Sequence, residues 1–280
     1  PTLPPELERT IFEVSALSRP TTIPNLMLVA QRVKIWVEPL LYHGILLSDQ
    51  DPRVIGFPGF TLDIVLRAID EKPPGFLKYA VKHLFLDLYR GSGSGQRMAP
   101  YLDTIFKACT GITSLVAWAG VNDNLSTLAS LDSLHRLSID MQEVFETNPQ
   151  NCFAHPLFRN ITHLEINGCP HDEFTGIALI PHLTHFAFSD VGLCAVLRPA
   201  FHSCARLICI ILVSEAAEAR IDASMNSVQP LLEDGRFVAI SQGDFWEDWY
   251  RGAYMANDYW ALADAFLAAR RAGKVDREYS

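Results

Sequence analysis

The sequence predicts an α/β protein in which parallel strands alternate with helical connectors, between N-terminal helices and a C-terminal helix. Three observations predict this class. A short apolar pattern recurs along the middle of the chain, helical segments lie between its copies, and hydrophobic residues make up 49% of the chain against 20% charged residues. That balance is typical of a folded protein with a continuous core.

The recurring pattern is apolar-x-x-apolar-x-apolar, and it appears six times between residues 81 and 212. Leucine-rich repeats contain about 20–29 residues, with a short strand in each. The first step holds a Gly/Ser insertion at 91–95, and it alone falls outside that range. Residues 44–242 are therefore predicted to form an irregular leucine-rich-repeat solenoid. The second apolar positions are Leu84, Leu115, Leu137, Leu164, Phe186 and Ile210, with steps of 31, 22, 27, 22 and 24 residues.

Helical connectors are expected over 98–109 and 194–204, where apolar residues recur at helical spacing. Two further strands, with weaker patterns, are expected at 45–47 and 237–240. Together these segments predict one parallel sheet, with the connecting helices packed on one of its two faces.

The N-terminus has the pattern of a helix that starts at Leu3-Pro4-Pro5, because proline fits the first turn of a helix. Leu7, Ile11, Phe12 and Val14 mark its apolar face. The segment 18–22 is expected to end it, and a second helix is predicted over 23–37, ended by Pro39.

This segment, residues 1–43, resembles an F-box, and more narrowly the F-box-like segments of proteins abundant in mushroom-forming fungi. F-box families dock on a Skp-type adaptor within a cullin ubiquitin ligase, so the resemblance implies that partner here. The alternative is that the helices only cap the repeat array. By resemblance, the residues that make or support the contact are Leu3, Pro4, Leu7, Ile11, Leu28, Val29 and Trp36.

Residues 243–280 form an aromatic-rich tail whose second part is predicted to be a helix over 257–271. Asp258 stands near its start, and Arg270 and Arg271 stand in its last turn. The aromatic residues of the tail are expected to pack over the last repeat; the alternative is an aromatic-lined pocket or partner surface.

Side chains alternate along each strand, so every second residue is expected on one concave face. A protein target is predicted to bind there, contacting residues His83, Asp87, Trp118, Arg136, Asp140, His163, Glu165, Asn167 and His185. The alternative is a solvated sheet face.

Four of these residues, His163, His185, Glu165 and Arg136, are expected to lie close together because neighbouring strands are about 5 Å apart. Such a set can bind a metal, relay protons or hold an anionic ligand. The sequence contains no GxSxG or HExxH motif, so no catalytic residue, cofactor or metal is predicted outright.

The net charge and the length of the apolar runs argue against nucleic acid and membranes as partners. A net charge of −9 and a pI near 5.4 argue against nucleic acid as a partner. No apolar run reaches the roughly 18 residues of a membrane span, so no membrane partner is expected. The six cysteines include no CxxC pair and are interpreted as free thiols, which favours the cytoplasm or the nucleus.

The leading hypothesis is therefore a substrate-recruiting adaptor of a ubiquitin ligase, with no chemistry of its own. The alternative is an enzyme or a small-molecule-binding protein that uses the His/Glu/Arg cluster of the concave face on the same scaffold.

Overall fold

The structure is a computed structural model, and it describes residues 3–48, 56–87, 98–118, 120–145, 152–168, 174–214, 217 and 225–275. Within these ranges the protein has an α/β fold. Eight parallel strands form one sheet that is open at both ends, and they lie in the same order as along the chain. The strands are β1 (Gly44–Ser48), β2 (His83–Asp87), β3 (Ser114–Ala117), β4 (Arg136–Asp140), β5 (His163–Gly168), β6 (His185–Phe188), β7 (Cys209–Ser214) and β8 (Phe237–Ser241).

The predicted apolar positions of the strands lie in one lateral row. Leu84 pairs with Leu115, which pairs with Leu137, and the row continues without a shift to Phe237 of β8. These side chains are buried in the main hydrophobic core. The six predicted strands are confirmed, and so are the two weaker ones at the ends of the sheet.

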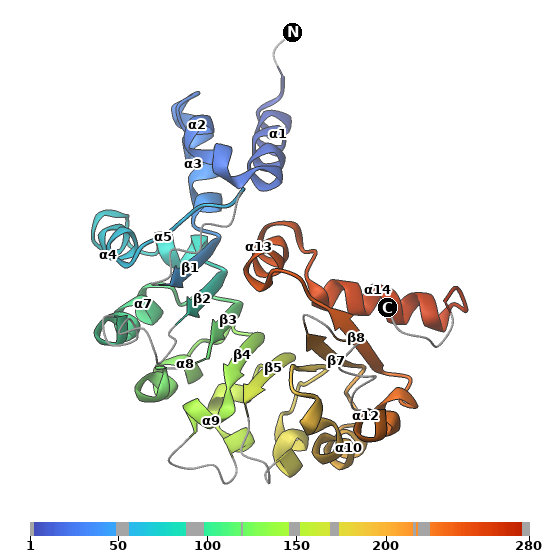
Figure 1. Ribbon diagram of the computed structural model, residues 1–280. Helices are drawn as coiled ribbons and strands as arrows, with labels where there is room; N and C mark the ends of the chain where they lie inside the picture. The colour runs from blue at the N-terminus through green and yellow to red at the C-terminus, as the bar shows by residue number, and fades with distance from the viewer. Residues whose placement is uncertain are drawn as a thin grey trace.

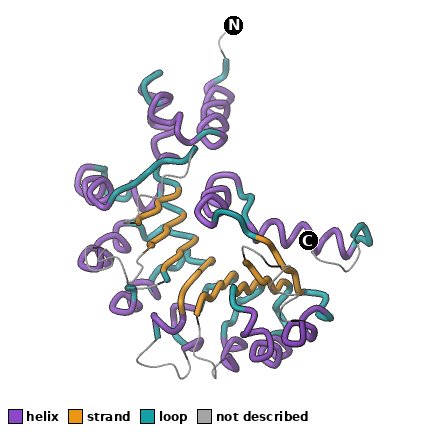
Figure 2. The backbone as a smooth tube through the Cα atoms, in the orientation of Figure 1, coloured by secondary structure: helices purple, strands orange, loops and turns teal. Residues whose placement is uncertain are grey.

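The sheet is curved, with most connecting helices along its outer side (Figures 1 and 2). Connections between parallel neighbours return on the same side of the sheet because the crossover has a fixed hand. The expected connector over 98–109 begins with a 3₁₀ turn, and the one over 194–204 ends at Ser203. The connecting helices are α4 (Leu62–Glu71), α5 (Phe76–Ala80), α7 (Leu102–Ala108), α8 (Leu125–Ala129), α9 (Met141–Val144), α10 (Cys194–Ser203) and α12 (Met225–Leu232).

The N-terminal helices extend away from the β1 end of the sheet (Figure 1). They are α1 (Pro5–Ser18), α2 (Ile23–Leu26) and α3 (Gln31–Leu41), around a small core of their own. The single helix predicted over 23–37 was wrong, because Ala30 is extended and separates α2 from α3. Pro39 lies inside α3 rather than ending it, and the helix continues for two more residues.

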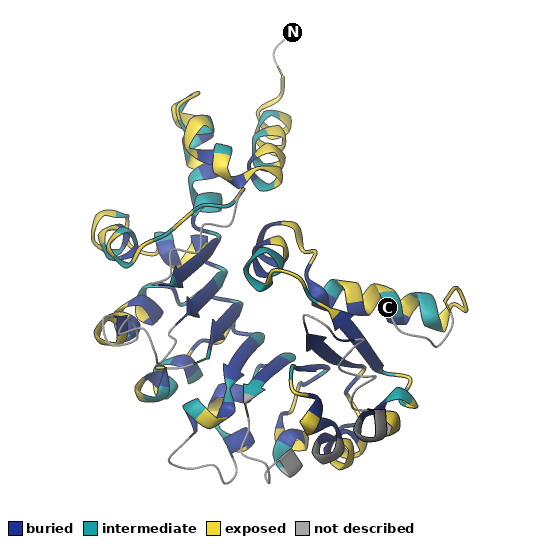
Figure 3. Cartoon of the chain, in the orientation of Figure 1, coloured by how far each residue is buried: buried dark blue, intermediate teal, exposed yellow. Residues whose placement is uncertain are grey.

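Two C-terminal helices, α13 (Phe245–Met255) and α14 (Tyr259–Arg271), lie on the inner side of the curved sheet (Figure 1). Each begins at an aspartate, Asp244 or Asp258, whose carboxylate accepts hydrogen bonds from backbone N–H groups of the first turn. The helix predicted over 257–271 is confirmed, and it begins at Tyr259. Figure 3 shows that the strands beneath these helices are buried.

The tail does not pack over the last repeat alone, which corrects the sequence-based expectation. Aromatic residues of α13 pack on β1, β2 and β3, where Trp249 contacts Phe85, and α14 packs on β6, β7 and β8. The two helices therefore cover the inner face at both ends of the sheet. A chain that turns back after β8 has no further strand to bury its apolar residues, and the inner face offers that surface.

The cysteines of the described residues, Cys109, Cys152, Cys194, Cys204 and Cys209, are free and buried. Cys169 and the Gly/Ser insertion at 91–95 lie outside the described residues. In the part of the chain that the structure describes, no helix combines the length and the hydropathy needed to cross a bilayer.

Candidate functional site

The residues that the F-box resemblance points to form an apolar surface on the protruding N-terminal helices. Leu7 and Ile11 lie four residues apart on α1 and are 54% and 57% exposed, and Leu3, just before the helix, is 49% exposed. Leu28 and Val29, in the turn before α3, are 85% and 61% exposed. These five exposed side chains therefore all belong to the N-terminal helical segment, which has only a small core of its own.

Two residues of the same set have different environments. Pro4 is exposed and stands at the N-cap of α1. Trp36 is half-buried and packs against the core formed by Ala16, Ile23 and Val33, so it holds the helices together. The Trp36 contact is thus an internal one.

The inner face of the sheet is apolar at its two ends and polar at its centre. Leu46 and Phe85 face α13 at one end, and Ile211 and Ile240 face α14 at the other. Between them, β4, β5 and β6 present Arg136, Ser138, His163, Glu165 and His185. The polar centre lies beneath the junction between α13 and α14.

The two predicted histidines do lie side by side. The rings of His163 and His185 are parallel, with centroids 4.1 Å apart, and Trp260 of α14 meets both rings edge-on. Each Nδ1 contacts the hydroxyl of the preceding threonine, Thr162 or Thr184. Burial, followed by the charges of His185 and Arg136, lowers the pKa of His163 to about 3, so this ring is neutral.

Glu165 is the most deeply buried charged residue of the polar centre, at 3% exposure. Its carboxylate accepts a hydrogen bond from the Tyr259 hydroxyl at 3.1 Å and another from Ser138. Burial raises the pKa of Glu165 against these two hydrogen bonds, and it raises the pKa of Tyr259 well above the ordinary value. The pair joins β5 to the start of α14.

Arg136 of β4 forms an ion pair with Asp258 at 2.9 Å. The same carboxylate accepts a hydrogen bond from the N–H of Ala261 and begins α14. One aspartate thus caps the helix and holds it on the sheet. A charge-assisted contact of a partly buried pair is stronger than an exposed one.

A hydrogen-bonded row crosses the C-terminal ends of the central strands. The Trp118 indole N–H and the Asn167 amide both donate to the Ser138 hydroxyl, at 3.1 and 3.3 Å. Ser189 in turn donates to Asn167. Because Ser138 accepts these two bonds, its own proton is free for Glu165.

The two predicted aspartates hold local structure. Asp87 accepts a hydrogen bond from the Ser48 hydroxyl at 2.7 Å, which joins β2 to β1. Asp140 accepts one from the N–H of Glu143 and caps α9.

His83 is separated from the histidine pair and lies beneath α13. Its ring is near those of His43 and Trp249. Burial, with smaller contributions from His43 and Arg136, lowers the pKa of His83 to about 3. Next to it, a cavity of about 40 Å³ lies between the sheet and the C-terminal helices, and Glu165 and Asp248 line it. That volume suits a few water molecules.

Sequence reasoning placed His163, His185, Glu165 and Arg136 together, and it missed their partners. Those partners are Asp258, Tyr259 and Asp264, all from the tail. Asp264 faces His185 at 3.1 Å and also approaches the thiol of Cys209. The only available signal was that two acidic residues, Asp258 and Asp264, stand at the start and in the middle of a predicted helix.

The face expected to receive a protein target is therefore covered in large part by the chain's own helices. Comparisons with models of protein families, with curated proteins and with solved structures found no match for this chain.

Proposed function

We propose that this chain is a substrate-recruiting adaptor of a cullin-type ubiquitin ligase, whose N-terminal helices dock on a Skp-type protein. The proposal rests on the F-box resemblance of residues 1–43. The proposal includes a leucine-rich-repeat scaffold. The consecutive parallel strands support it, and so do the distances of 22 to 31 residues along the chain between equivalent strand positions.

The observation that carries the proposal is the exposure of Leu3, Leu7, Ile11, Leu28 and Val29. Isolated exposed leucines are common on proteins, whereas a group of them on one protruding element is typical of a protein interaction site. An amphipathic helix that leaves its apolar residues in water gains stability when a partner covers them.

Within residues 1–43, the helix α3 is the part that caps the sheet. Leu41 packs against both the N-terminal core and the main core. Glu38 of α3 pairs with Lys72 at 2.9 Å, and α3 contacts α5. Since α3 provides these contacts, the exposed residues of α1 and of the turn at 27–30 remain for a partner.

A target would then contact the half-buried residues at the C-terminal ends of the central strands, among them Trp118, Asp140 and Asn167. The rest of the predicted concave surface lies under α13 and α14. A target that binds the central face itself has to displace those helices.

The polar centre gives less support to an enzyme. Arg136, Glu165 and His185 each contact a carboxylate or hydroxyl of the tail, and the adjoining cavity has room for water only. These contacts favour a role in holding the C-terminal helices.

The test measures the affinity of the full chain for a purified Skp-type adaptor by biolayer interferometry. We expect micromolar or tighter binding, and a loss of at least about tenfold in the double variant Leu7→Gln plus Leu28→Gln, because a tenfold loss corresponds to about 1.4 kcal/mol. Leu262→Gln is the matched control, since Leu262 on α14 is 51% exposed and belongs to no part of this surface.

Absence of binding by the unaltered chain at micromolar concentrations would contradict the proposal. Equal affinities of the double variant and the control would contradict the assigned surface. Far-UV circular dichroism of all three proteins verifies that the substitutions leave the fold intact.

A further inference from the structure

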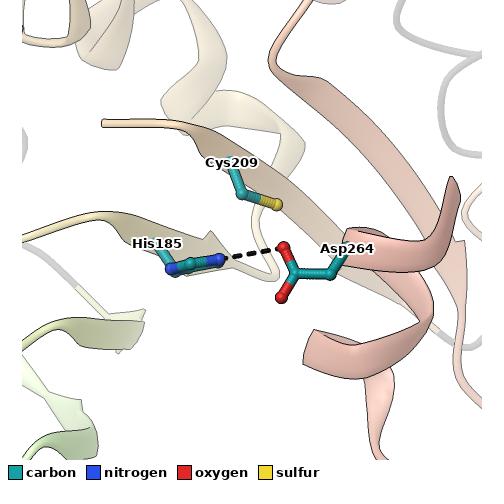
Figure 4. A group of neighbouring side chains, drawn as sticks. All are labelled: His185, Cys209 and Asp264. Carbon is teal, nitrogen blue, oxygen red and sulfur yellow. Dashed lines mark hydrogen bonds and ion pairs between the residues drawn. The ribbon is translucent and has the colours of Figure 1, made fainter. Parts of the chain in front are cut away.

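Three potential metal ligands from distant parts of the sequence meet on the inner face of the sheet. They are Nε2 of His185 on β6, Sγ of Cys209 on β7 and a carboxylate oxygen of Asp264 on α14, and all three atoms lie within 4.8 Å of one another. Figure 4 shows the three side chains pointing toward one another. The site is distinct from the proposed adaptor surface.

The combination of donor atoms narrows the kind of ion. Imidazole nitrogen, thiolate sulfur and carboxylate oxygen are the ligands of zinc, at about 2.0–2.3 Å from the metal. Calcium and magnesium use oxygen ligands, so a buried cysteine disfavours them. Tetrahedral coordination at those bond lengths places neighbouring ligand atoms about 3.3–3.8 Å apart. The His185–Asp264 contact, at 3.1 Å, is close to that spacing, and all three ligand atoms lie within 4.8 Å of one another.

In one tautomer of His185, the hydrogen bonds around the ring leave a lone pair on Nε2 that is free for a cation. The Thr184 hydroxyl lies 3.1 Å from the Thr162 carbonyl and 2.8 Å from Nδ1 of His185, and when it donates to the carbonyl, its oxygen accepts the Nδ1–H. In the neutral ring, Nε2 then carries a lone pair, yet it faces the Asp264 carboxylate at 3.1 Å. Only a proton or a metal ion between the two atoms makes that contact favourable.

The same threonine provides the support that metal-bound histidines normally have. A histidine ligand usually donates its other ring N–H to a fixed acceptor, which sets the direction of the ring. Thr184 performs this task here, and the stacked His163 ring and the edge of Trp260 restrict the imidazole further. The histidine is thus fixed in position before any ion binds.

The exposed side of the site is formed by Asp264. His185 and Cys209 are buried, while the side chain of Asp264 is 55% exposed. An ion can enter beside Asp264, and water can provide a fourth ligand there. Burial, followed by the charge of Asp264, raises the pKa of the Cys209 thiol to about 12, against the opposite effect of Arg271.

We propose that His185, Cys209 and Asp264 bind one divalent transition metal ion of the zinc type, which fastens α14 to β6 and β7. On binding, the metal replaces the thiol proton of Cys209, since the thiolate is the form that coordinates. The C-terminal helix, which covers the face expected to recognise a target, is then held by the ion in addition to the Arg136–Asp258 pair.

The test is a titration of the full, untagged chain with Co²⁺, which reports a thiolate ligand through a sulfur-to-metal absorption band in the near ultraviolet. We expect one equivalent to saturate the band, and Zn²⁺ to displace Co²⁺ because it binds such sites more tightly. Cys209→Ser is expected to abolish the band, and Cys204→Ser is the matched control because Cys204 is also buried and lies outside the cluster.

A second variant separates binding from folding. Asp264→Asn alters a half-exposed side chain, so the metal-free variant is expected to keep the melting temperature of the unaltered chain within about 2 °C. Its Co²⁺ affinity is expected to fall at least tenfold. Absence of a thiolate band in the unaltered chain, or an unchanged band in Cys209→Ser, would overturn the proposal.

Discussion

The helices that precede the first strand and those that follow the last strand place their apolar side chains in opposite environments. On α1, Leu7 and Ile11 are more than half exposed, whereas Trp249 on α13 and Trp260 on α14 are buried against the strands. Each buried aromatic residue removes about 150–250 Å² from water. The C-terminal helices are therefore part of the folded body, while the N-terminal ones keep an uncovered surface.

The difference separates residues that stabilise the fold from residues available for binding. Hydrophobic burial contributes to folding only when the surface is covered within the chain. An exposed leucine contributes little to the stability of the fold, so its substitution tests binding to a partner. Substitution of a buried tryptophan tests whether packing holds the tail on the sheet.

The largest effect that tests this comparison is expected from Trp249→Ala. The side chain packs edge-on against Phe85 and Tyr250, and truncation of a buried tryptophan costs about 3–5 kcal/mol. We expect the low end, near 3 kcal/mol, because within the described residues its indole Nε1 has no hydrogen-bond partner. Leu28→Ala is the counterpart in the N-terminal region and is expected to change the free energy of unfolding by less than about 0.5 kcal/mol. Urea denaturation measures both, and similar values would remove the distinction between the N-terminal and the C-terminal helices.

An intermediate effect is expected from Gly252→Ala at the junction of α13 and α14. Alanine favours a helix over glycine by about 1 kcal/mol, but its Cβ would lie 2.8 Å from Cβ of Asp258. The displaced Asp258 would lose its contacts with Arg136 and Ala261. We therefore expect a net loss of about 1–2 kcal/mol in thermal or urea denaturation.

Gly243→Ala is the control for this substitution, because a Cβ at Gly243 would meet no atom within 4 Å. It is expected to change stability by less than about 0.5 kcal/mol. If Gly252→Ala stabilised the protein as helix propensity alone predicts, the close approach of α13 to Asp258 would be wrong.

The smallest effect concerns Asp248, which lies where α13 faces Gln242 and Tyr259. Burial, together with the nearby Asp258 carboxylate, raises the pKa of Asp248 to about 6, against hydrogen bonds from the Tyr259 N–H and the Gln242 amide and the charge of Arg251. The unfolded carboxyl titrates near 3.8. Between these values the folded chain holds a proton that the unfolded chain has released, so stability falls as the pH rises through about 4 to 6.

Asp248→Asn removes this dependence and keeps an oxygen for both hydrogen bonds. We expect the variant to be more stable by about 1 kcal/mol at pH 7.5, a value reduced for the partial exposure of the group, and to have no advantage at pH 4. Urea midpoints at the two pH values measure this. An equal gain at both would show that the carboxylate charge is not the cause.

The strands could be predicted because side chains alternate between the two faces of a strand, which is a local property of the sequence. Alternation places Leu84, Leu115 and Leu137 on the core side whichever neighbours they meet, and the step length of each repeat brings them into one row. The histidine pair followed from the same register. The break in the N-terminal helix at Ala30 did not follow, because residues 23–37 contain good helix formers and the turn depends on how α1 packs on α3.

The sequence by itself determined the order of strands, the row of core residues and the ends of α14, since alternation, capping and apolar spacing act within a few residues. Only the tertiary structure decided that the tail turns back into the curve of the sheet. That position depends on contacts between residues about 80 to 210 apart in the chain, among them Arg136 with Asp258, His185 with Asp264 and Tyr254 with Leu41. Such pairs leave no local pattern, because each member is an ordinary polar or aromatic residue until the fold brings its partner within reach.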